Sequence, residues 1–179
     1  MQKPLPPFEE WPLRVPNIKK VVAKIDNLTD EFSASSTQEE ALRIIKKFFK
    51  ECDRLDDACQ IIQIRHSCDT SDEKLIAAND ALDEGMPYIQ NASNKFKRAV
   101  LESPFRPYLE KKLGTHLFTM YEYSLRAFDE RIIEDSIEEN KLVTSYQVLL
   151  SSCLVEFHGE NYNLSRMGKF MESLDRETR

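Results

Sequence analysis

An unbroken alternation of three- and four-residue steps runs through residues 37–68. The residues that follow it are Ile45, Phe48, Cys52, Leu55, Cys59, Ile62 and His66. These steps place side chains along one side of an α-helix, as in the seam of a coiled coil. Thr37 followed by Glu40 is a capping-box pair that marks a helix start. The sequence therefore predicts one helix over residues 37–68, roughly 45 Å long at ~1.5 Å per residue.

A second helix of similar length is predicted over residues 72–102, with Thr70 or Ser71 as its N-cap. Its apolar stripe contains Leu75, Ala78, Leu82, Met86, Ile89, Ala92, Phe96, Ala99 and Val100. The short link and the matched lengths predict that the two helices form an antiparallel hairpin. Pro87 lies inside the second helix and predicts a kink, which Gly85 would ease.

Shorter helices are predicted around this hairpin. Apolar spacing and capping signals favour helices over residues 17–35, 107–114, 115–128 and 129–153. Residues 154–164 alternate instead around a glycine-containing turn, which predicts a β-hairpin. Ser165 is expected to cap a last short helix, and Ser173 to cap one more.

The predicted fold class is all-α (mainly helical). We expect an elongated helical bundle with a long antiparallel helix hairpin and one small β-hairpin near the C-terminus. Residues 1–16 contain five prolines and are expected to form an extended lead-in. The helical bundle is assigned to residues 17–153, and residues 154–179 form a further region.

Composition excludes several classes of function. The net charge of −6 argues against a nucleic-acid backbone as the main partner. The N-terminus has no apolar run long enough for a signal peptide or a membrane span, so a cytoplasmic location is expected. Four cysteines in a chain of 179 residues fit reduced, buried thiols better than a disulfide framework. The basic group Lys95, Lys97 and Arg98 is interpreted as a solvated helix face.

The most suggestive candidate for a metal site is Cys52, Cys59 and His66, which recur every seven residues. Seven helical residues rise about 10.5 Å, whereas zinc ligands lie within ~2.3 Å of the metal. The three cannot share one ion, so we interpret them as core residues. His66 and Cys68 could form a nucleophile pair, but the end of a helix explains them better.

The remaining candidates also have a simpler explanation. The carboxylates Glu134, Asp135, Glu138 and Glu139 are expected on a solvated helix face, and His158 in a turn. With four scattered glycines, the chain has no Gly-rich phosphate loop. No catalytic, cofactor-binding or metal-binding residue is predicted in this chain.

Four stretches together resemble a known family. They are IRHSCDTSDE at 64–73, LESPFRPYLEKKLG at 101–114, IIEDSIEENKLVTSY at 132–146 and VEFHGENYNLSRMGKFMESLDRETR at 155–179. Their sequences and order resemble the amino-terminal region of the oligoendopeptidase F branch of the thimet-oligopeptidase-like zinc peptidases. One departure is Cys68, where an aliphatic residue is expected; Cys68 is predicted to pack as a small hydrophobe.

The resemblance implies a mainly helical, two-lobed, cytoplasmic parent enzyme that cuts short peptides in a deep channel. Its zinc would lie on a downstream HExxH helix, with the Glu as general base. None of His66, His116 and His158 begins that motif. The chain alone is therefore predicted to be inactive, with zinc only in the parent. Residues 154–179 would begin the missing catalytic region, which is the expected partner.

Three functional hypotheses remain open at this point. The first is a non-catalytic N-terminal fragment that forms part of the wall of the substrate channel. Short peptides would contact this fragment only in the complete parent enzyme. The second is a free-standing helical adaptor derived from the same family, and the third an enzyme with an unrecognised site. Because the sequence stops just after the cap at Ser173, we expect the fragment. A cut surface would expose apolar residues, so a homodimer is expected in isolation.

Overall fold

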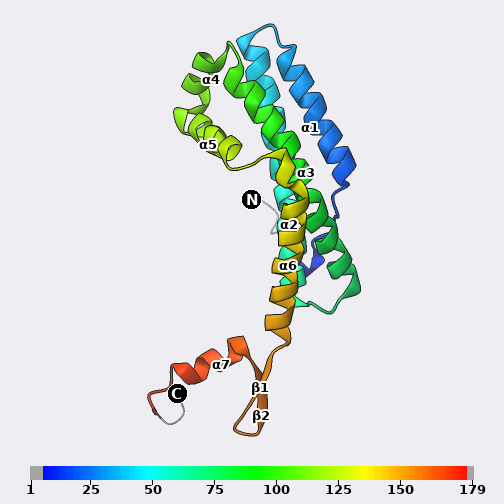
Figure 1. The fold of residues 1–179 in the computed structure, drawn as a ribbon, viewed down its shortest axis with the longest axis vertical. Helices are drawn as coiled ribbons and strands as arrows, with labels where there is room; N and C mark the ends of the chain where they lie inside the picture. Colours follow the sequence, from blue (N-terminus) through cyan, green and yellow to red (C-terminus); the bar gives the residue numbers. More distant parts are fainter. Residues whose placement is uncertain (1–5, 177–179) are drawn as a thin grey trace. The chain divides into compact units, whose positions relative to one another are not determined.

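A computed structural model describes residues 6–176, which form two compact units divided between Ile137 and Glu138. The chain is mainly helical with one two-stranded antiparallel hairpin, as predicted (Figure 1). The helices are η1 (Phe8–Glu10), α1 (Ile18–Ser33), α2 (Gln38–Cys68), α3 (Glu73–Glu102), α4 (Arg106–Leu113), α5 (Thr115–Arg126), η2 (Glu130–Ile132), α6 (Ile133–Ser152) and α7 (Leu164–Met171). The strands are β1 (Leu154–Phe157) and β2 (Glu160–Asn163).

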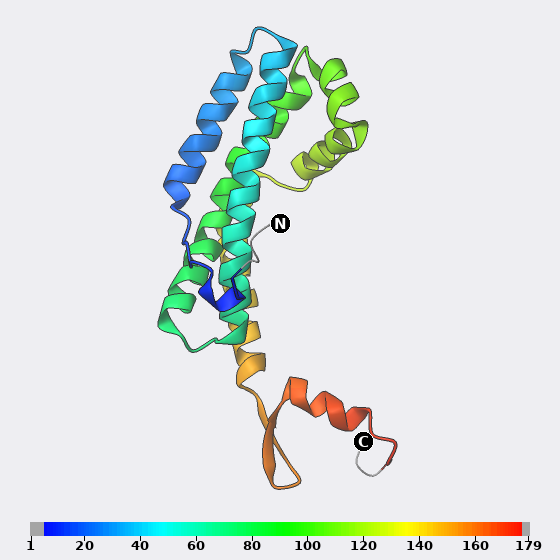
Figure 2. The same ribbon diagram turned by 180° about the vertical axis from the view of Figure 1, so that it is seen from behind.

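Three long helices form the centre of the first unit, with α1 and α2 alongside α3 (Figures 1 and 2). Helices α2 and α3 run antiparallel, which confirms the predicted hairpin: the Phe48 and Phe96 rings stack with centroids 4.1 Å apart, and Cys59 Sγ lies 4.0 Å from Met86 Sδ. Helix α1 runs parallel to α3, because Ile18 lies against Gly85 and Phe32 against Phe96.

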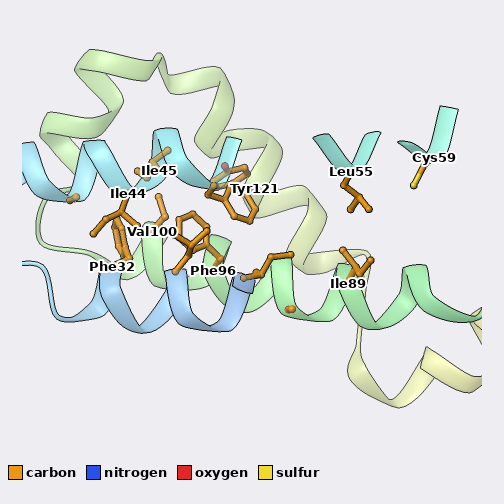
Figure 3. Packing of buried hydrophobic residues seen from close by; sticks show 14 of the residues in the cluster. Phe32, Ile44, Ile45, Leu55, Cys59, Ile89, Phe96, Val100 and Tyr121 are labelled. Atoms are coloured by element: carbon orange, nitrogen blue, oxygen red, sulfur yellow. The ribbon is translucent and has the colours of Figure 1, made fainter. Parts of the chain in front are cut away.

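The core of this unit lies where α1, α2 and α3 meet (Figure 3). Phe96 is fully buried, stacked on Phe48 and edge-on to Phe32 with ring centroids 5.6 Å apart. Aromatic pairs in such offset and edge-on geometries contribute about 0.5–1.5 kcal/mol beyond the burial of their area. The apolar stripes recognised in the sequence supply this core.

Caps set the helix starts. The Thr37 side chain accepts the Glu40 N–H at 3.2 Å, and the Glu40 carboxylate accepts the Ser36 N–H at 3.2 Å, so the predicted capping pair forms with a small shift. The predicted cap of the next helix is wrong: Asp72 caps α3 and accepts the Lys74 N–H at 2.8 Å. Asp72 offers a charged acceptor one residue closer to the helix, and carboxylates are favoured there.

Helices α4 and α5 follow α3 and are joined at Gly114, whose φ of +88° suits glycine. Gly114 is also the N-cap of α5. Arg106 of α4 connects the two helices, with Nε 2.7 Å from Glu110 and Nη2 2.8 Å from Glu122. Helix α5 also packs against α3 through buried Phe118 and Tyr121.

The N-terminal segment is fastened to the end of α2. Residues 8–10 form a short 3₁₀ helix instead of a fully extended lead-in. Arg65 donates to the carbonyl oxygens of Phe8 and Trp11, and its guanidinium lies 5.6 Å from the Phe8 ring centroid. Trp11 Nε1 donates to the Pro6 carbonyl at 3.0 Å. Residues 1–5 of the predicted lead-in lie outside the described residues.

The second unit contains most of α6, the β-hairpin and α7. Val155 pairs with Tyr162 and Phe157 with Glu160. The turn at His158 and Gly159 has φ values of 52° and 78°, as a two-residue hairpin turn requires. Phe170 of α7 closes against the hairpin, with ring centroids 4.7 Å from Phe157 and 5.0 Å from Tyr162.

One predicted cap in this unit is wrong, and the helix predicted after the other lies partly outside the described residues. Asn163 caps α7 and accepts the Arg166 N–H at 2.8 Å, so the helix begins one residue before Ser165. The Ser173 hydroxyl accepts the Asp175 N–H at 3.2 Å, but residues 174–176 form bends and a turn. Residues 177–179 of the helix predicted there lie outside the described residues. None of the helices in 6–176 combines the length and the apolar character needed to cross a membrane.

Candidate functional site

The three seam residues considered as metal ligands lie in the core of the first unit. Cys59 and His66 are buried and Cys52 is half-buried along α2. Burial raises the pKa of Cys52 and of Cys59 to about 11, with a further contribution from the nearby carboxylate of Asp56. Both thiols are therefore protonated at neutral pH, whereas a nucleophile or a metal ligand must be a thiolate. The interpretation as core residues is confirmed for Cys59 and His66.

His66 and Cys68, considered above as a nucleophile pair, lie in different environments. His66 is buried and Cys68 is exposed, both in the last turn of α2. Cys68 thus does not pack as a small hydrophobe, contrary to prediction, because α2 ends at this residue and its side chain faces solvent. Arg65, which precedes His66, donates hydrogen bonds to the N-terminal segment.

The carboxylates of α6 are exposed as predicted. Glu134 and Asp135 face solvent in the first unit, and Glu138 and Glu139 do so in the second. Glu134 accepts a 3.3 Å hydrogen bond from the Tyr88 hydroxyl. His158 occupies the hairpin turn, as expected. Such exposed positions provide none of the desolvation that tunes an acid–base pair.

A buried polar cluster lies between α3 and α5 and was not predicted from the sequence. Lys97 was assigned to a solvated face with Lys95 and Arg98, but its ammonium lies 2.8 Å from Ser124 Oγ and 3.3 Å from Asn94 Oδ1. Burial lowers the pKa of Lys97. Asn94 Nδ2 and the Tyr121 hydroxyl are buried without a hydrogen-bond partner. Only the packing of α5 on α3 creates this cluster, and no local sequence signal marks it.

The second unit exposes a continuous set of large apolar side chains on one side of α6. We call this set the α6 apolar face: Leu142, Val143, Tyr146, Leu149 and Leu150. Steps of one, three and four residues place them on the same side of the helix. Their exposed fractions are 63%, 50%, 60%, 61% and 37%. The sequence predicted a helix over residues 129–153, but it did not predict that this side of the helix is exposed.

Leucines elsewhere in the second unit are exposed as well. Leu154 of β1 is 67% exposed, Leu164 of α7 46% and Leu174 fully exposed. Helical periodicity identifies which side of a helix is apolar, but it does not identify the segment that packs against that side. Large contiguous apolar patches are rare on monomeric proteins and mark interaction surfaces. The α6 apolar face is therefore the strongest candidate functional surface of the chain.

Comparison with known proteins identifies the family. The sequence profile of the Peptidase M3 N-terminal domain family matches residues 8–128, about two thirds of the chain. The chain belongs to this family. The resemblance seen in the sequence is thereby confirmed. No curated protein sequence matches the chain at a significant level.

Solved structures extend the similarity of this M3 N-terminal domain chain beyond residue 128. PZ peptidase A, solved with an inhibitor, is 35% identical over 97% of this chain, with a TM-score of 0.91. Two structures described as oligoendopeptidase F, one of them from Bacillus anthracis, are 31% and 30% identical, with TM-scores of 0.91 and 0.90. The chain spans only about 30% of the length of these relatives.

The potential zinc ligands of this M3 N-terminal domain chain lie apart from one another in its described part. Within residues 6–176, no three side chains of His, Cys, Asp or Glu lie close enough together to hold a metal ion. His66, His116 and His158 are followed by Ser, Leu and Gly, so none begins an HExxH motif.

Proposed function

We propose that the chain is the non-catalytic N-terminal helical part of a zinc metallo-oligopeptidase. The remaining two thirds of such an enzyme would supply the zinc, the activated water and the cleavage of short peptides. The observation that carries this proposal is the α6 apolar face, exposed in a chain that spans about 30% of its relatives.

The partner that we assign to this face is the catalytic part of an M3 peptidase polypeptide. Burying a leucine side chain contributes about 1.5–3 kcal/mol, so covering Leu142, Leu149 and Leu154 together would give a substantial docking energy. The β-hairpin supports the same partner, because two strands alone are marginal in water and gain stability from neighbours. Phe157, Tyr162 and Phe170 already form the small internal cluster of this unit.

In the assembled enzyme, this helical part would form a section of the wall around the substrate channel. A wall selects by shape: thin, flexible peptides enter and folded proteins do not. We assign the assembly to the cytoplasm. Removing this part should therefore alter either the hydrolysis of short peptides or the rejection of folded proteins; if both are unchanged, the wall role is wrong.

Complementation tests the proposal directly. The chain would be mixed with the remaining part of PZ peptidase A, and hydrolysis of a quenched fluorescent peptide measured with zinc present. We expect no hydrolysis by the chain alone and restored hydrolysis by the mixture. The double variant Leu142→Asp/Leu149→Asp should lose complementation.

The matched control is Ser145→Asp/Gln147→Asp, which adds the same charge at two exposed positions of α6 outside the apolar face and should complement normally. Hydrolysis by the chain alone would overturn the non-catalytic assignment. Failure of the wild-type chain to bind the remaining part in sedimentation would overturn the docking assignment and leave the adaptor hypothesis.

A further inference from the structure

A groove with a volume of about 930 Å³ lies in the first unit, between the N-terminal segment and helices α1 and α2. Trp11 and Val15 form part of its outer wall, and Arg65 holds this wall in place through the carbonyls of Phe8 and Trp11. The volume falls in the range of small-molecule sites. No residue that lines the groove belongs to the α6 apolar face. The ligand inferred for the groove therefore does not depend on the proposed docking of that face.

One part of the groove lining, which we call its floor, is mainly hydrocarbon, although Asn17, Cys52 and Ser93 also line the groove. It is formed by Val21 and Ile25 of α1 and by Leu55, Ala58 and Ile61 of α2. Pro12 and Pro16 in the wall have no backbone N–H to donate. A peptide lying here would leave its own N–H and C=O groups facing apolar surface, which is costly. An aliphatic chain has no such groups, so this floor favours a hydrocarbon ligand.

The rim of the groove is positive, although the whole chain carries −6. Among the described residues that line the groove, the cations are Arg14, Lys20, Lys24 and Arg54, and the carboxylates are Glu51 and Asp57. Glu51 is neutralised by Lys24 at 2.7 Å and Arg54 at 2.9 Å, and its pKa is lowered mainly by the hydrogen bond from Lys24.

Two cations of the rim are therefore available to a ligand. Arg14 and Lys20 are exposed and make no ion pair within the described part of the chain. Asp57 is the remaining carboxylate among the described residues that line the groove. The excess of positive charge beside an apolar floor suits a ligand with one anionic end.

We propose that this groove binds a linear aliphatic carboxylate, with the hydrocarbon chain on the floor and the carboxylate between Arg14 and Lys20. Binding is reversible and involves no covalent step. Trp11 is the only tryptophan of the chain and lies in the groove wall, so its fluorescence reports occupancy directly.

The test is a titration of the full chain with dodecanoate below its critical micelle concentration, followed by Trp11 fluorescence. We expect a saturable change, with dodecanol binding more weakly. Arg14→Gln/Lys20→Gln should weaken dodecanoate binding roughly tenfold and leave dodecanol unaffected, as expected for two exposed charge contacts. Ala58→Trp should fill the floor; binding is then followed by calorimetry and should be lost for both ligands.

The control is Lys46→Gln/Lys111→Gln, which removes the same charge at exposed positions outside the groove and should bind dodecanoate like the wild type. The proposal is overturned if dodecanoate gives no saturable change, or if the control weakens binding as much as Arg14→Gln/Lys20→Gln does. Tighter binding of a short apolar peptide than of dodecanoate would also overturn it, because it would assign the groove to peptides.

Discussion

Ile18 of α1 packs directly onto Gly85 of α3, so closely that a Cβ atom at residue 85 would overlap Cγ1 and Cδ1 of Ile18. The absence of a side chain at this one position of α3 lets the two helices approach. A glycine inside a helix costs about 1 kcal/mol relative to alanine. The closer packing of α1 on α3 offsets that cost.

Gly85→Ala should therefore lower the free energy of unfolding by about 1–3 kcal/mol, since overpacking outweighs the gain in helix propensity. Urea unfolding measures this loss. Adding Ile18→Ala should recover part of it, because the overlapping atoms are then gone. Gly168→Ala in α7 is the control: open space surrounds that position, so stability should not fall. Equal behaviour of the two alanine variants would contradict the packing argument.

Arg65→Leu should release the N-terminal segment from α2. The variant removes charge-assisted hydrogen bonds to two carbonyls and the contact with the Phe8 ring, worth about 1–3 kcal/mol together. A red shift of Trp11 fluorescence and faster amide exchange in residues 8–13 would report the release. Arg131→Leu, which breaks only an exposed pair with Asp129, should leave Trp11 fluorescence unchanged.

The raised pKa values of Cys52 and Cys59 predict selective reactivity. Raising a thiol pKa from 9.0 to about 11 leaves roughly a hundredfold less thiolate at pH 8. Iodoacetamide should modify the exposed Cys68 first and Cys52 and Cys59 far more slowly, as mass spectrometry of digests would show. Rapid modification of Cys59 in the folded chain would refute the prediction.

The same shift predicts a loss of stability in alkali. Folding favours the protonated thiols, so their contribution is complete below pH 9 and is lost as the pH rises through about 11. Denaturant unfolding between pH 8 and pH 11 measures the slope. The variant Cys52→Ala/Cys59→Ala should show a shallower decline in this window, and an unchanged slope would assign the alkaline loss to other groups.

The α6 apolar face predicts self-association of the isolated chain. Two copies that cover this face on each other bury leucines worth about 1.5–3 kcal/mol each, so sedimentation should show dimers that increase with concentration. Leu142→Asp/Leu149→Asp should weaken association more than tenfold, and Ser145→Asp/Gln147→Asp, at exposed positions outside the face, should not. A strictly monomeric wild type at high concentration would count against an accessible face.

Sequence alone determined the elements of the fold and the family. The boundaries of α2 agree with the prediction within one residue, because its 3–4 spacing and the Thr37 cap are local properties. The caps failed at Asp72 and Asn163, where several neighbouring polar side chains compete for the same N–H groups. Family membership followed from stretches spread over the chain and needed no coordinates.

Tertiary structure decided which periodic residues are buried and by what. Phe48 and Leu149 both lie on apolar helical stripes, yet Phe48 is 3% exposed and Leu149 61%. A periodic pattern shows which side of a helix is apolar, whereas burial requires another segment to pack against that side. Lys97 shows the converse, since α5 covers a side chain that its charge would leave in water. The groove beside Trp11 likewise requires the N-terminal segment to lie beside α1 and α2, and Arg65 of α2 donates hydrogen bonds to this segment.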